Sequence, residues 1–296
     1  MGVAWSYVLK MEELGLLDRP GAAVLDIGSS NLYQADAAAI AAFVRRHAAD
    51  PGTDLEAFAA RAAHGSGYDP IRGGRNETFL GEVLERAGFR YTAIDIADGY
   101  RTRIVDLNHG SLPRNMVGAY DSVINFGATE HILNQMNSFR IIHDATSKGG
   151  FIWHQLPAIG YVDHGYFTYT GRFFFDLAGY NHYEIVDAWF DGPGGDEDIF
   201  AAFRSYQSIF PRLADRLARI GEHPKETALA ALRVPMISLN VVYRKVNDAP
   251  FNGAVEMSTS VGLIGTAVRA MYSGDLVGRL RHAGLRRVLR RILGRS

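Results

Sequence analysis

The sequence predicts an α/β fold, a doubly wound and mostly parallel sheet with helices on both faces. Short apolar segments that end at glycine or polar residues alternate with longer segments in which apolar residues recur at helical spacing. The segment Ala22–Ile27 is almost wholly apolar, as strands are when helices cover both sides of a sheet. Apolar residues make up 47% of the 296-residue chain and charged residues 21%, a composition that supports a large core.

The first half of the chain contains three expected strands and two expected helices. Their boundaries are Ala22–Ile27, Arg90–Ile96 and Arg103–Val105 for the strands, and Asp36–His47 and Asn76–Ala87 for the helices. Asn76 is of a residue type that caps helix N-termini, and Gly88 permits the left-handed conformation that ends a helix. Residues 48–75, rich in glycine, interrupt this pattern, and we interpret them as an insertion with a short helix near Leu55–Ala63.

The second half contains four expected strands, two expected helices and a second insertion. The strands are Ser122–Phe126, Phe151–Gln155, Tyr183–Phe190 and Ile237–Lys245, and the helices are Asn134–Ser147 and Gly171–Ala178. Residues 148–150, a lysine and two glycines, favour the end of the first helix. Thr170 favours the start of the second helix and Gly179 its end. Residues 191–236 form the insertion, an acidic loop followed by two or three helices.

Polar and acidic residues close the first four strands. They occur in the segments Asp26-Ile27-Gly28-Ser29-Ser30, Asp95-Ile96, Asp106-Leu107 and Asn125-Phe126-Gly127. Because ligands of doubly wound sheets bind at the carboxyl ends of the strands, we expect these residues to surround one ligand. Helix capping and loop solvation are the alternative explanation for the three aspartates.

These residue types suit a nucleoside that carries a positively charged amino acid. Gly28 lets the backbone approach a ligand closely, and Asp95 can accept hydrogen bonds from ribose hydroxyls. Asp106 can accept a hydrogen bond from the amine of adenine, while Ile96 and Leu107 can enclose the base. Asp26 and the nearby backbone can meet the ammonium group of the amino acid.

The motifs that carry these residues resemble those of the class I S-adenosylmethionine-dependent methyltransferases. The similar segments are VLDIGSS, AIDIADG, VDLN, SVINFGATEHI, GGFIWHQLP, YEIV and ISLNVVYRK. The resemblance covers about residues 20–190 and 237–245, and it implies seven strands with an antiparallel last strand. It also implies S-adenosylmethionine as cofactor, bound by the four strand-end segments named above. Only Gly28 remains of the family's GxGxG motif.

Two other functions fit the same fold. A nicotinamide-dependent oxidoreductase needs G-x-G-x-x-G after the first strand and an acid about 20 residues later. The segment GSSNLY lacks those glycines, and Asp95 is much farther along the chain. A binding or regulatory module that retains S-adenosylmethionine without turnover is the second alternative, and the reduced glycine motif is its basis.

The methyl acceptor is expected beyond the fourth and fifth strands. An in-line displacement at the methyl group requires a positioned acceptor, and a hydroxyl acceptor benefits from a general base. Glu130, His131 and His164 are the catalytic candidates, with His154 also considered and Asp163 as a partner that orients His164. The alternative for Glu130 and His131 is a role at a helix N-terminus and in packing.

We expect a small-molecule acceptor, with a hydroxyl of a sugar, glycan precursor or secondary metabolite favoured. In some methyltransferases a similar Glu-His pair helps to hold a divalent metal. In this chain Gly127 occupies the place where a further ligand would help. Only Glu130, His131 and one distant histidine are available, so we expect no metal.

The chain is expected to form one methyltransferase domain over residues 1–246, with insertions at about 48–75 and 191–236, and an extension over 247–296. Residues 279–296 contain seven arginines and no acidic residue, although the net charge is −1. Apolar residues share one helical stripe of this segment, which is typical of a helix that binds a membrane surface or an acidic partner. A terminal helix packed on the acidic remainder of the chain is an equal alternative. That acidic remainder argues against a nucleic-acid partner.

The composition also limits the site chemistry and the compartment. The chain contains no cysteine, which excludes disulfides, thiol nucleophiles and cysteine-ligated zinc. No segment reaches the roughly 18 consecutive apolar residues of a membrane-spanning helix. Lys10, Glu12 and Glu13 interrupt the first apolar run, so we expect no signal peptide and a cytoplasmic protein, peripheral to the membrane if the basic helix binds lipid.

Overall fold

The computed structural model describes residues 2–69, 73–74, 77–161, 164–191, 197–198 and 236–253. The strands are β1 (Gly2–Ala4), β2 (Ala23–Ile27), β3 (Asn31–Tyr33), β4 (Tyr68–Asp69), β5 (Gly73–Gly74), β6 (Arg90–Asp95), β7 (Thr102–Ile104), β8 (Tyr120–Phe126), β9 (Thr146–Ile159), β10 (Glu184–Asp191), β11 (Glu197–Asp198) and β12 (Ile237–Arg244). The helices are α1 (Trp5–Glu13), α2 (Ala37–His47), α3 (Leu55–Gly65), α4 (Leu80–Arg86), α5 (Gln135–Ala145) and α6 (Gly171–Asn181), with short 3₁₀ turns η1 (Arg114–Met116) and η2 (Thr129–His131).

The central sheet has the strand order β11-β10-β12-β9-β8-β2-β6-β7. Strands β7, β6, β2, β8 and β9 are parallel, and β12 is antiparallel to both β9 and β10. This arrangement confirms the predicted α/β class, its seven strands and its antiparallel last strand, with the two-residue β11 added at one edge. From β2 the chain first builds outward through β6 and β7, and it then returns to β8 on the other side. The topological switch point therefore lies between β2 and β8.

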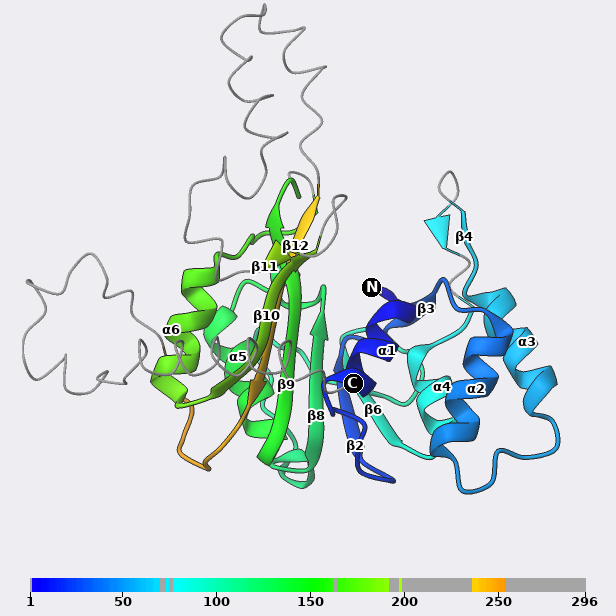
Figure 1. Cartoon of the computed structure of the whole chain (residues 1–296). Helices are drawn as coiled ribbons and strands as arrows, with labels where there is room; N and C mark the ends of the chain where they lie inside the picture. The colour runs from blue at the N-terminus through cyan, green and yellow to red at the C-terminus, as the bar shows by residue number, and fades with distance from the viewer. Residues whose placement is uncertain are drawn as a thin grey trace, which may run out of the picture.

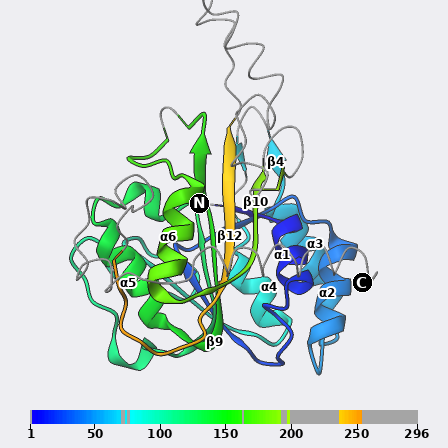
Figure 2. The ribbon, with the colours of Figure 1, turned by 60° about the vertical axis from the view of Figure 1, so that its left-hand side comes forward.

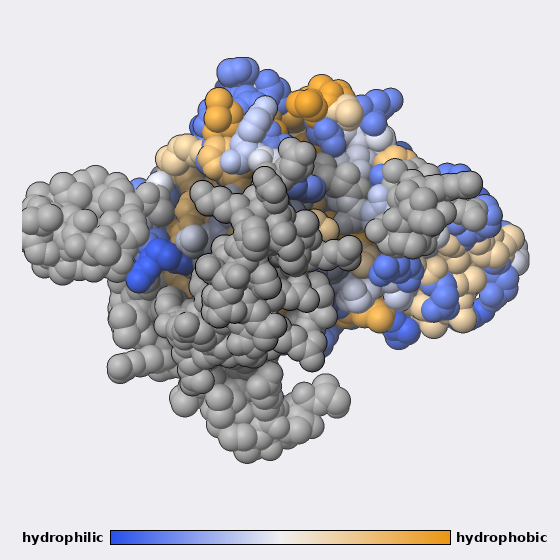
Figure 3. Space-filling model, turned by 90° about the horizontal axis from the view of Figure 1, so that it is seen from above, coloured by the Kyte–Doolittle hydropathy of each residue, from blue (hydrophilic) through white to orange (hydrophobic). Residues whose placement is uncertain are grey.

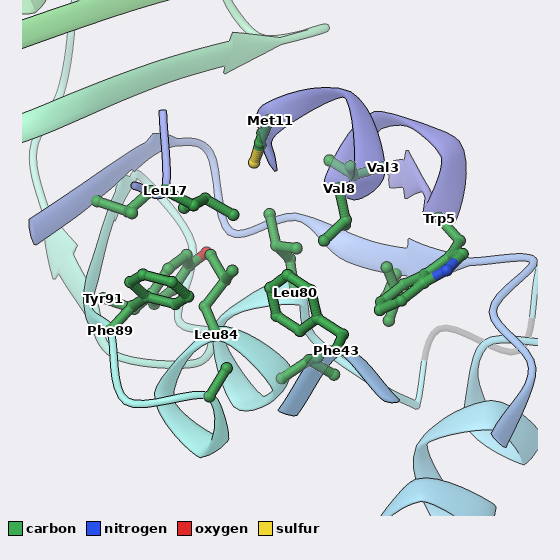
Figure 4. Close-up of a cluster of buried hydrophobic side chains, with 14 of the residues drawn as sticks. Val3, Trp5, Val8, Met11, Leu17, Phe43, Leu80, Leu84, Phe89 and Tyr91 are labelled. Carbon is green, nitrogen blue, oxygen red and sulfur yellow. The ribbon is translucent and has the colours of Figure 1, made fainter. Parts of the chain in front are cut away.

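Helices cover both faces of this sheet. Figure 2 shows α5 and α6 on one side and α1 to α4 on the other, with the strands between them. Each face has its own apolar core: one contains buried side chains of α1, α2, α3 and α4, and the other those of α5 and α6. Figure 4 shows the first core, where Val3, Trp5, Val8 and Met11 of the N-terminal segment pack toward Phe43 and its neighbours.

The predicted strands agree with the structure except for β9. The sequence predicts a strand at Phe151–Gln155, whereas β9 runs over 14 residues and α5 ends at Ala145 rather than at Ser147. The Gly149 N–H donates to the carbonyl of Lys245 (2.6 Å), and the Lys245 N–H donates to the carbonyl of Gly150 (2.9 Å). Because the chain after β12 pairs with these glycines, they extend the sheet instead of ending the helix.

Two predicted helix ends are wrong. Helix α4 begins at Leu80, so Asn76 is not its cap. Thr78 and Phe79 lie beside β3, since the Leu32 N–H donates to the carbonyl of Thr78 (2.8 Å) and Phe79 forms a β-bridge with Asn31. Helix α6 continues past Gly179 to Asn181, and His182 adopts the left-handed conformation (φ 54°) that ends it.

The N-terminal segment and much of residues 48–75 belong to the layer that covers one face of the sheet. Strand β1 pairs with β3 in parallel, which places α1 over that face (Figure 1). Helix α3, inside the expected insertion, packs on α2 through buried residues such as Ala59 and Ala62. Among the described residues of this segment, β4 projects from the layer (Figure 1), and it pairs with β5 in antiparallel fashion.

Several expectations concern residues outside the described ranges. These are the helices of the insertion at 191–236, the basic segment 279–296 and the orienting role of Asp163. Residues 247–253 of the expected extension are described and pack on α5 and α6. His143 bonds to the carbonyl of Ala249 through its Nε2 (2.9 Å), and the Asn252 N–H donates to Asn181 (2.8 Å). Within the described residues, none of the helices has the length and apolar character needed to cross a membrane.

Candidate functional site

The carboxyl ends of β2, β6, β8 and β9 lie at one edge of the sheet, at the top of Figure 1. Figure 3 looks down on this edge, where the described surface mixes hydrophilic and hydrophobic side chains. The last residues of β2, β6 and β8, together with the loops that follow β2, β6, β7, β8 and β9, carry the residues that the sequence predicts for the cofactor and the catalytic candidates Glu130, His131 and His164.

The loop after β2 is fixed by its neighbours in the sheet. Gly28 has a φ of 97°, a conformation that side chains rarely adopt, and its N–H donates to the carbonyl of Ile94 (2.8 Å). The Ser29 N–H donates to Oδ2 of Asp95 (3.2 Å), and the Ser30 N–H donates to Oδ2 of Asp26 (3.0 Å). The loop is therefore anchored to the two carboxylates that close β2 and β6.

Asp26 lies beneath this loop, fully buried. Its Oδ2 also accepts a hydrogen bond from the hydroxyl of Tyr91 (2.7 Å), while Oδ1 has no partner. Burial raises the pKa of Asp26 to about 7, because a charge inside the protein loses its hydration. Its main contacts thus hold the loop in shape, and Oδ1 is the atom left for a ligand.

Asp95 and Asp106 close the adjacent strands β6 and β7. Asp95 Oδ1 accepts from the N–H groups of Ile96 (2.7 Å) and Ala97 (3.1 Å). With the bond from Ser29, three of the roughly four acceptor positions of this carboxylate are used, which leaves room for about one further donor. Asp106 accepts from the N–H of Asn108 (2.8 Å).

The two apolar residues predicted to enclose a base differ in exposure. Ile96 is 68% exposed, whereas Leu107 is buried in the core on the α5 and α6 side. The side chain of Asn137 donates to the carbonyl of Leu107 (2.8 Å), and Asn134 donates to the carbonyl of Asn108 (2.8 Å). Helix α5 thus positions the loop that carries Asp106, a connection that the sequence did not reveal.

Most of the buried side-chain polar atoms without a partner, among the described residues, gather at the ends of β2 and β8. They are Asp26 Oδ1, Ser29 Oγ, Ser30 Oγ, Asn31 Nδ2 and both carboxylate oxygens of Glu130. A buried polar atom without a partner costs about 1–3 kcal/mol. The concentration of such atoms at the topological switch point is the strongest structural indication of a polar ligand there.

The residues that close β8 have less access to a ligand than the sequence suggests. The Asn125 side chain is fully buried, where its Nδ2 donates to Thr129 Oγ1 (2.9 Å) and contacts His154 Nδ1 (3.0 Å). Phe126 packs against Trp153 in the core. Gly127, with a φ of 74°, is the one of the three that is not buried.

Glu130, His131 and His164 form a cluster, which we call the Glu130 cluster. The Nε2 atoms of His164 and His131 lie 3.4 Å and 3.8 Å from Oε1 of Glu130, and the two imidazole rings are 4.9 Å apart. The Glu130 side chain is only 1% exposed, and burial raises its pKa to about 7. Burial and the neighbouring His164 lower the pKa of His131. The predicted catalytic residues are thus neighbours in space, and the acid beside His164 is Glu130.

Backbone hydrogen bonds hold the segment that carries His164 against Glu130. The N–H groups of Tyr166 (2.8 Å) and Phe167 (3.2 Å) both donate to the carbonyl of Glu130. A side chain at Gly165 would lie 2.9 Å from Cγ of Glu130, so only glycine fits this close approach. Gly165 was not identified from the sequence, since its contact is with a residue 35 positions away.

Hydrogen bonds among Thr129, Gln135 and Tyr169 hold the residues next to the cluster. Gln135 Nε2 donates to the carbonyl of Thr129 (2.7 Å), and the hydroxyl of Tyr169 donates to Gln135 Oε1 (2.6 Å). His154, which the sequence offered as a candidate base, contacts the side chain of Asn125, which also donates to Thr129. It is fully buried, and burial lowers its pKa to about 3, so it is neutral and structural.

No protein-family model and no curated protein matches the chain. Solved structures similar to it include the 1,6-didemethyltoxoflavin-N1-methyltransferase of Burkholderia thailandensis, with bound S-adenosylhomocysteine (15% identity, TM-score 0.39, 81% of this chain and 76% of that chain). Another is phosphoethanolamine N-methyltransferase 2 of Haemonchus contortus (14%, 0.42, 82% and 53%). A third is the O-methyltransferase of a trans-AT PKS multienzyme of Brevibacillus brevis (12%, 0.38, 82% and 73%).

This chain spans about half the length of the Haemonchus enzyme. All three similar proteins are methyltransferases by name, and they differ in acceptor and in the element methylated. At these identities and TM-scores the likeness assigns neither a cofactor nor an acceptor to this chain.

Proposed function

We propose that this protein transfers the methyl group of S-adenosylmethionine to a small-molecule acceptor. The observation that carries the proposal is the group of unpartnered polar atoms on residues 26–31, flanked by Asp95 and Asp106 at the ends of the adjacent strands. A nucleoside with an amino-acid tail supplies hydroxyl, amine and carboxylate groups for these atoms. The family resemblance of the sequence motifs points to the same ligand.

The cofactor is proposed to lie along the ends of β2, β6 and β7. Asp95 accepts one ribose hydroxyl, and Asp106 accepts from the adenine amine. Ile96, exposed beside Asp95, covers one face of the base. The amino-acid tail lies over the loop of Gly28, Ser29 and Ser30. The sulfonium methyl then points toward the end of β8, where the Glu130 cluster begins.

The chemistry requires an acceptor in line with the methyl–sulfur bond. The acceptor oxygen forms a bond to the methyl carbon while the sulfur leaves with the bonding electron pair, and S-adenosylhomocysteine is the product. The hydroxyl proton must pass to a base. His164, whose side chain is 46% exposed, is the proposed base, and Glu130 beside its Nε2 stabilises the imidazolium that forms.

The acceptor class is proposed from analogy with other enzymes of this fold. A hydroxyl of a sugar, glycan precursor or secondary metabolite suits a site with a base next to aromatic side chains such as Tyr161, whose ring lies 5.2 Å from that of His164.

Calorimetry on the purified chain tests this proposal. S-Adenosylmethionine and S-adenosylhomocysteine are expected to bind, whereas NAD is not. Asp95→Ala is expected to abolish binding because it removes both a ligand contact and the anchor of Ser29. Asp98→Ala is the matched control: Asp98 is an exposed aspartate of the same loop and accepts only from the N–H of Gly99.

Binding of NAD in place of both methyl-donor ligands would show that the proposal is wrong. Equal loss of affinity in the Asp95 and Asp98 variants would remove Asp95 from the site. Binding without turnover on any hydroxyl acceptor would favour a binding module.

A further inference from the structure

The Glu130 cluster has a geometry that its own three side chains do not explain. A hydrogen bond between an imidazole N–H and a carboxylate spans about 2.7–2.9 Å. In the cluster the two Nε2 atoms lie 3.4 Å and 3.8 Å from Oε1 of Glu130. Neither histidine therefore makes an ordinary hydrogen bond to this carboxylate, although both rings stand beside it.

The spacing matches that of ligand atoms around one metal ion. Ligands bound at about 2.1 Å in a tetrahedron are about 3.4 Å from one another. One ligand atom each from Glu130, His131 and His164 lies within 4.8 Å of the other two. Small side-chain rotations bring three atoms at these separations onto a common centre.

The surroundings of Glu130 independently indicate a missing cation. The side chain is 1% exposed, and neither of its oxygens has a hydrogen-bond partner among the residues that the structure describes. A buried carboxylate is normally paired or bound to a metal, because an isolated buried charge is very costly. No lysine or arginine forms an ion pair with Glu130 among the described residues. A cation between Glu130 and the two histidines satisfies this carboxylate.

We propose that Glu130, His131 and His164 bind one divalent transition-metal ion. This proposal departs from the expectation of no metal, which was based on Gly127 and on a third histidine distant in sequence. The structure brings His164 to the Glu-His pair from a different loop, so three ligands are present without a side chain at position 127. A Cβ there would lie 3.4 Å from Oε1 of Glu130, so the glycine leaves space beside the cluster.

The ligand set selects the kind of metal. Two imidazoles and one carboxylate suit zinc, iron, cobalt or nickel, whereas magnesium and calcium prefer oxygen ligands. Three protein ligands leave at least one coordination position open. If the proposed methyl transfer is correct, that position takes an acceptor oxygen. The ion then lowers the pKa of the acceptor hydroxyl, so that its proton passes to solvent water instead of to His164.

The test is a titration of the full-length, untagged chain with Co²⁺, after dialysis against a chelator, followed by visible absorption and by Zn²⁺ competition. One ion per chain is expected. Both His131→Ala and His164→Ala are expected to weaken binding by at least about tenfold. Glu130→Gln is expected to abolish it. His64→Ala is the matched control, since His64 is an exposed histidine on α3, remote from the cluster.

If Glu130→Gln does not fold, the two histidine variants still test the proposal. The side chains of His131 and His164 are 42% and 46% exposed, so their truncation leaves the core intact. Absence of saturable Co²⁺ binding, or equal affinity in the wild type and both histidine variants, would overturn the proposal.

Calorimetry with S-adenosylmethionine on the metal-free chain separates the two proposals. Methyl-donor binding without metal binding refutes only the metal site, and the reverse result refutes only the proposed function.

Discussion

At the scale of single residues, the aspartates that close β2 and β6 have opposite surroundings. Asp26 is fully buried beneath the loop after β2, with Tyr91 and the Ser30 N–H as donors to one oxygen. Asp95 is half-buried and accepts three backbone N–H groups. One carboxylate thus shapes the loop from inside, while the other remains within reach of a ligand.

Asp26 is expected to make stability depend on pH. Burial raises its pKa from 3.8 to about 7, so between these values the folded protein holds a proton that the unfolded chain has released. The contribution of Asp26 to the free energy of unfolding therefore falls as pH rises from about 4 to about 7, by at most about 1.4 kcal/mol per pH unit. Urea unfolding of wild type and Asp26→Asn across this range measures the effect.

The comparison with Asp26→Asn isolates this residue. His154, neutral when folded, contributes a slope of the opposite sign below its ordinary value of 6.5, and it does so equally in both proteins. The difference in stability between the variant and the wild type should grow with pH up to about 7 and then level off. Parallel curves would mean that Asp26 is ionised throughout, contrary to the account.

The sequence predicted which residues lie at the strand ends, but not where their side chains point. Asp95, Asp106 and Gly28 follow from their positions after apolar strands. Asn125 has the same kind of position, yet its side chain turns inward to Thr129 and His154. The direction of this side chain depends on contacts with β9, and the sequence around Asn125 carries no information about those contacts.

At the scale of elements, the segment after β9 is held on η2 by the backbone of Glu130. Gly165→Ala is expected to disturb this contact, because the added methyl would lie 2.9 Å from Cγ and 3.0 Å from the carbonyl oxygen of Glu130. Overpacking of this kind costs about 1–3 kcal/mol. The expected result is a lower melting temperature and a loss of acceptor turnover, with affinity for S-adenosylhomocysteine retained.

Gly160→Ala is not a suitable control for this variant, since its φ of 77° adds backbone strain. Gly150→Ala is better: a methyl there meets backbone oxygens at 2.9 Å and 3.0 Å, far from the cluster. This variant is expected to lower the stability of the protein, while the turnover rate per folded molecule stays unchanged. If Gly165→Ala behaves in the same way, the segment does not position His164.

Asn134, at the start of helix α5, is expected to stabilise both the helix and the loop that carries Asp106. Asn134 caps α5 by accepting from the Asn137 N–H (3.1 Å), and its Nδ2 donates to the carbonyl of Asn108 next to the Asp106 loop. Asn134→Ala should cost about 0.5–2 kcal/mol as a lost cap. It should also weaken binding of S-adenosylhomocysteine in calorimetry.

Thr170→Ala provides the comparison, because Thr170 caps α6 by accepting from the Phe173 N–H and does not touch the Asp106 loop. A similar loss of stability with unchanged affinity is expected. Equal affinities in both cap variants would show that α5 does not position Asp106 through Asn134.

At the scale of the whole molecule, the sheet and helices α2, α3 and α4 were predictable, whereas α1 and the pairing of β1 with β3 were not. Alternation of apolar strands and amphipathic helices is local, so it predicted the class and most strand boundaries. The pairing of β1 with β3 joins residues about thirty positions apart and involves three residues on each strand, too few for a pattern. The closeness of His164 to Glu130 was not predictable for the same reason, since His164 comes to Glu130 through tertiary contacts alone.

The central claim is that residues 26–31, 95 and 106 surround one adenosyl ligand. A crystal structure of the chain with S-adenosylhomocysteine tests it most directly. We expect a ribose hydroxyl within hydrogen-bond distance of Asp95, the adenine amine at Asp106 and the amino-acid tail over Gly28 to Ser30. Adenosine bound elsewhere, or bound here with neither Asp95 nor Asp106 in contact, would contradict it.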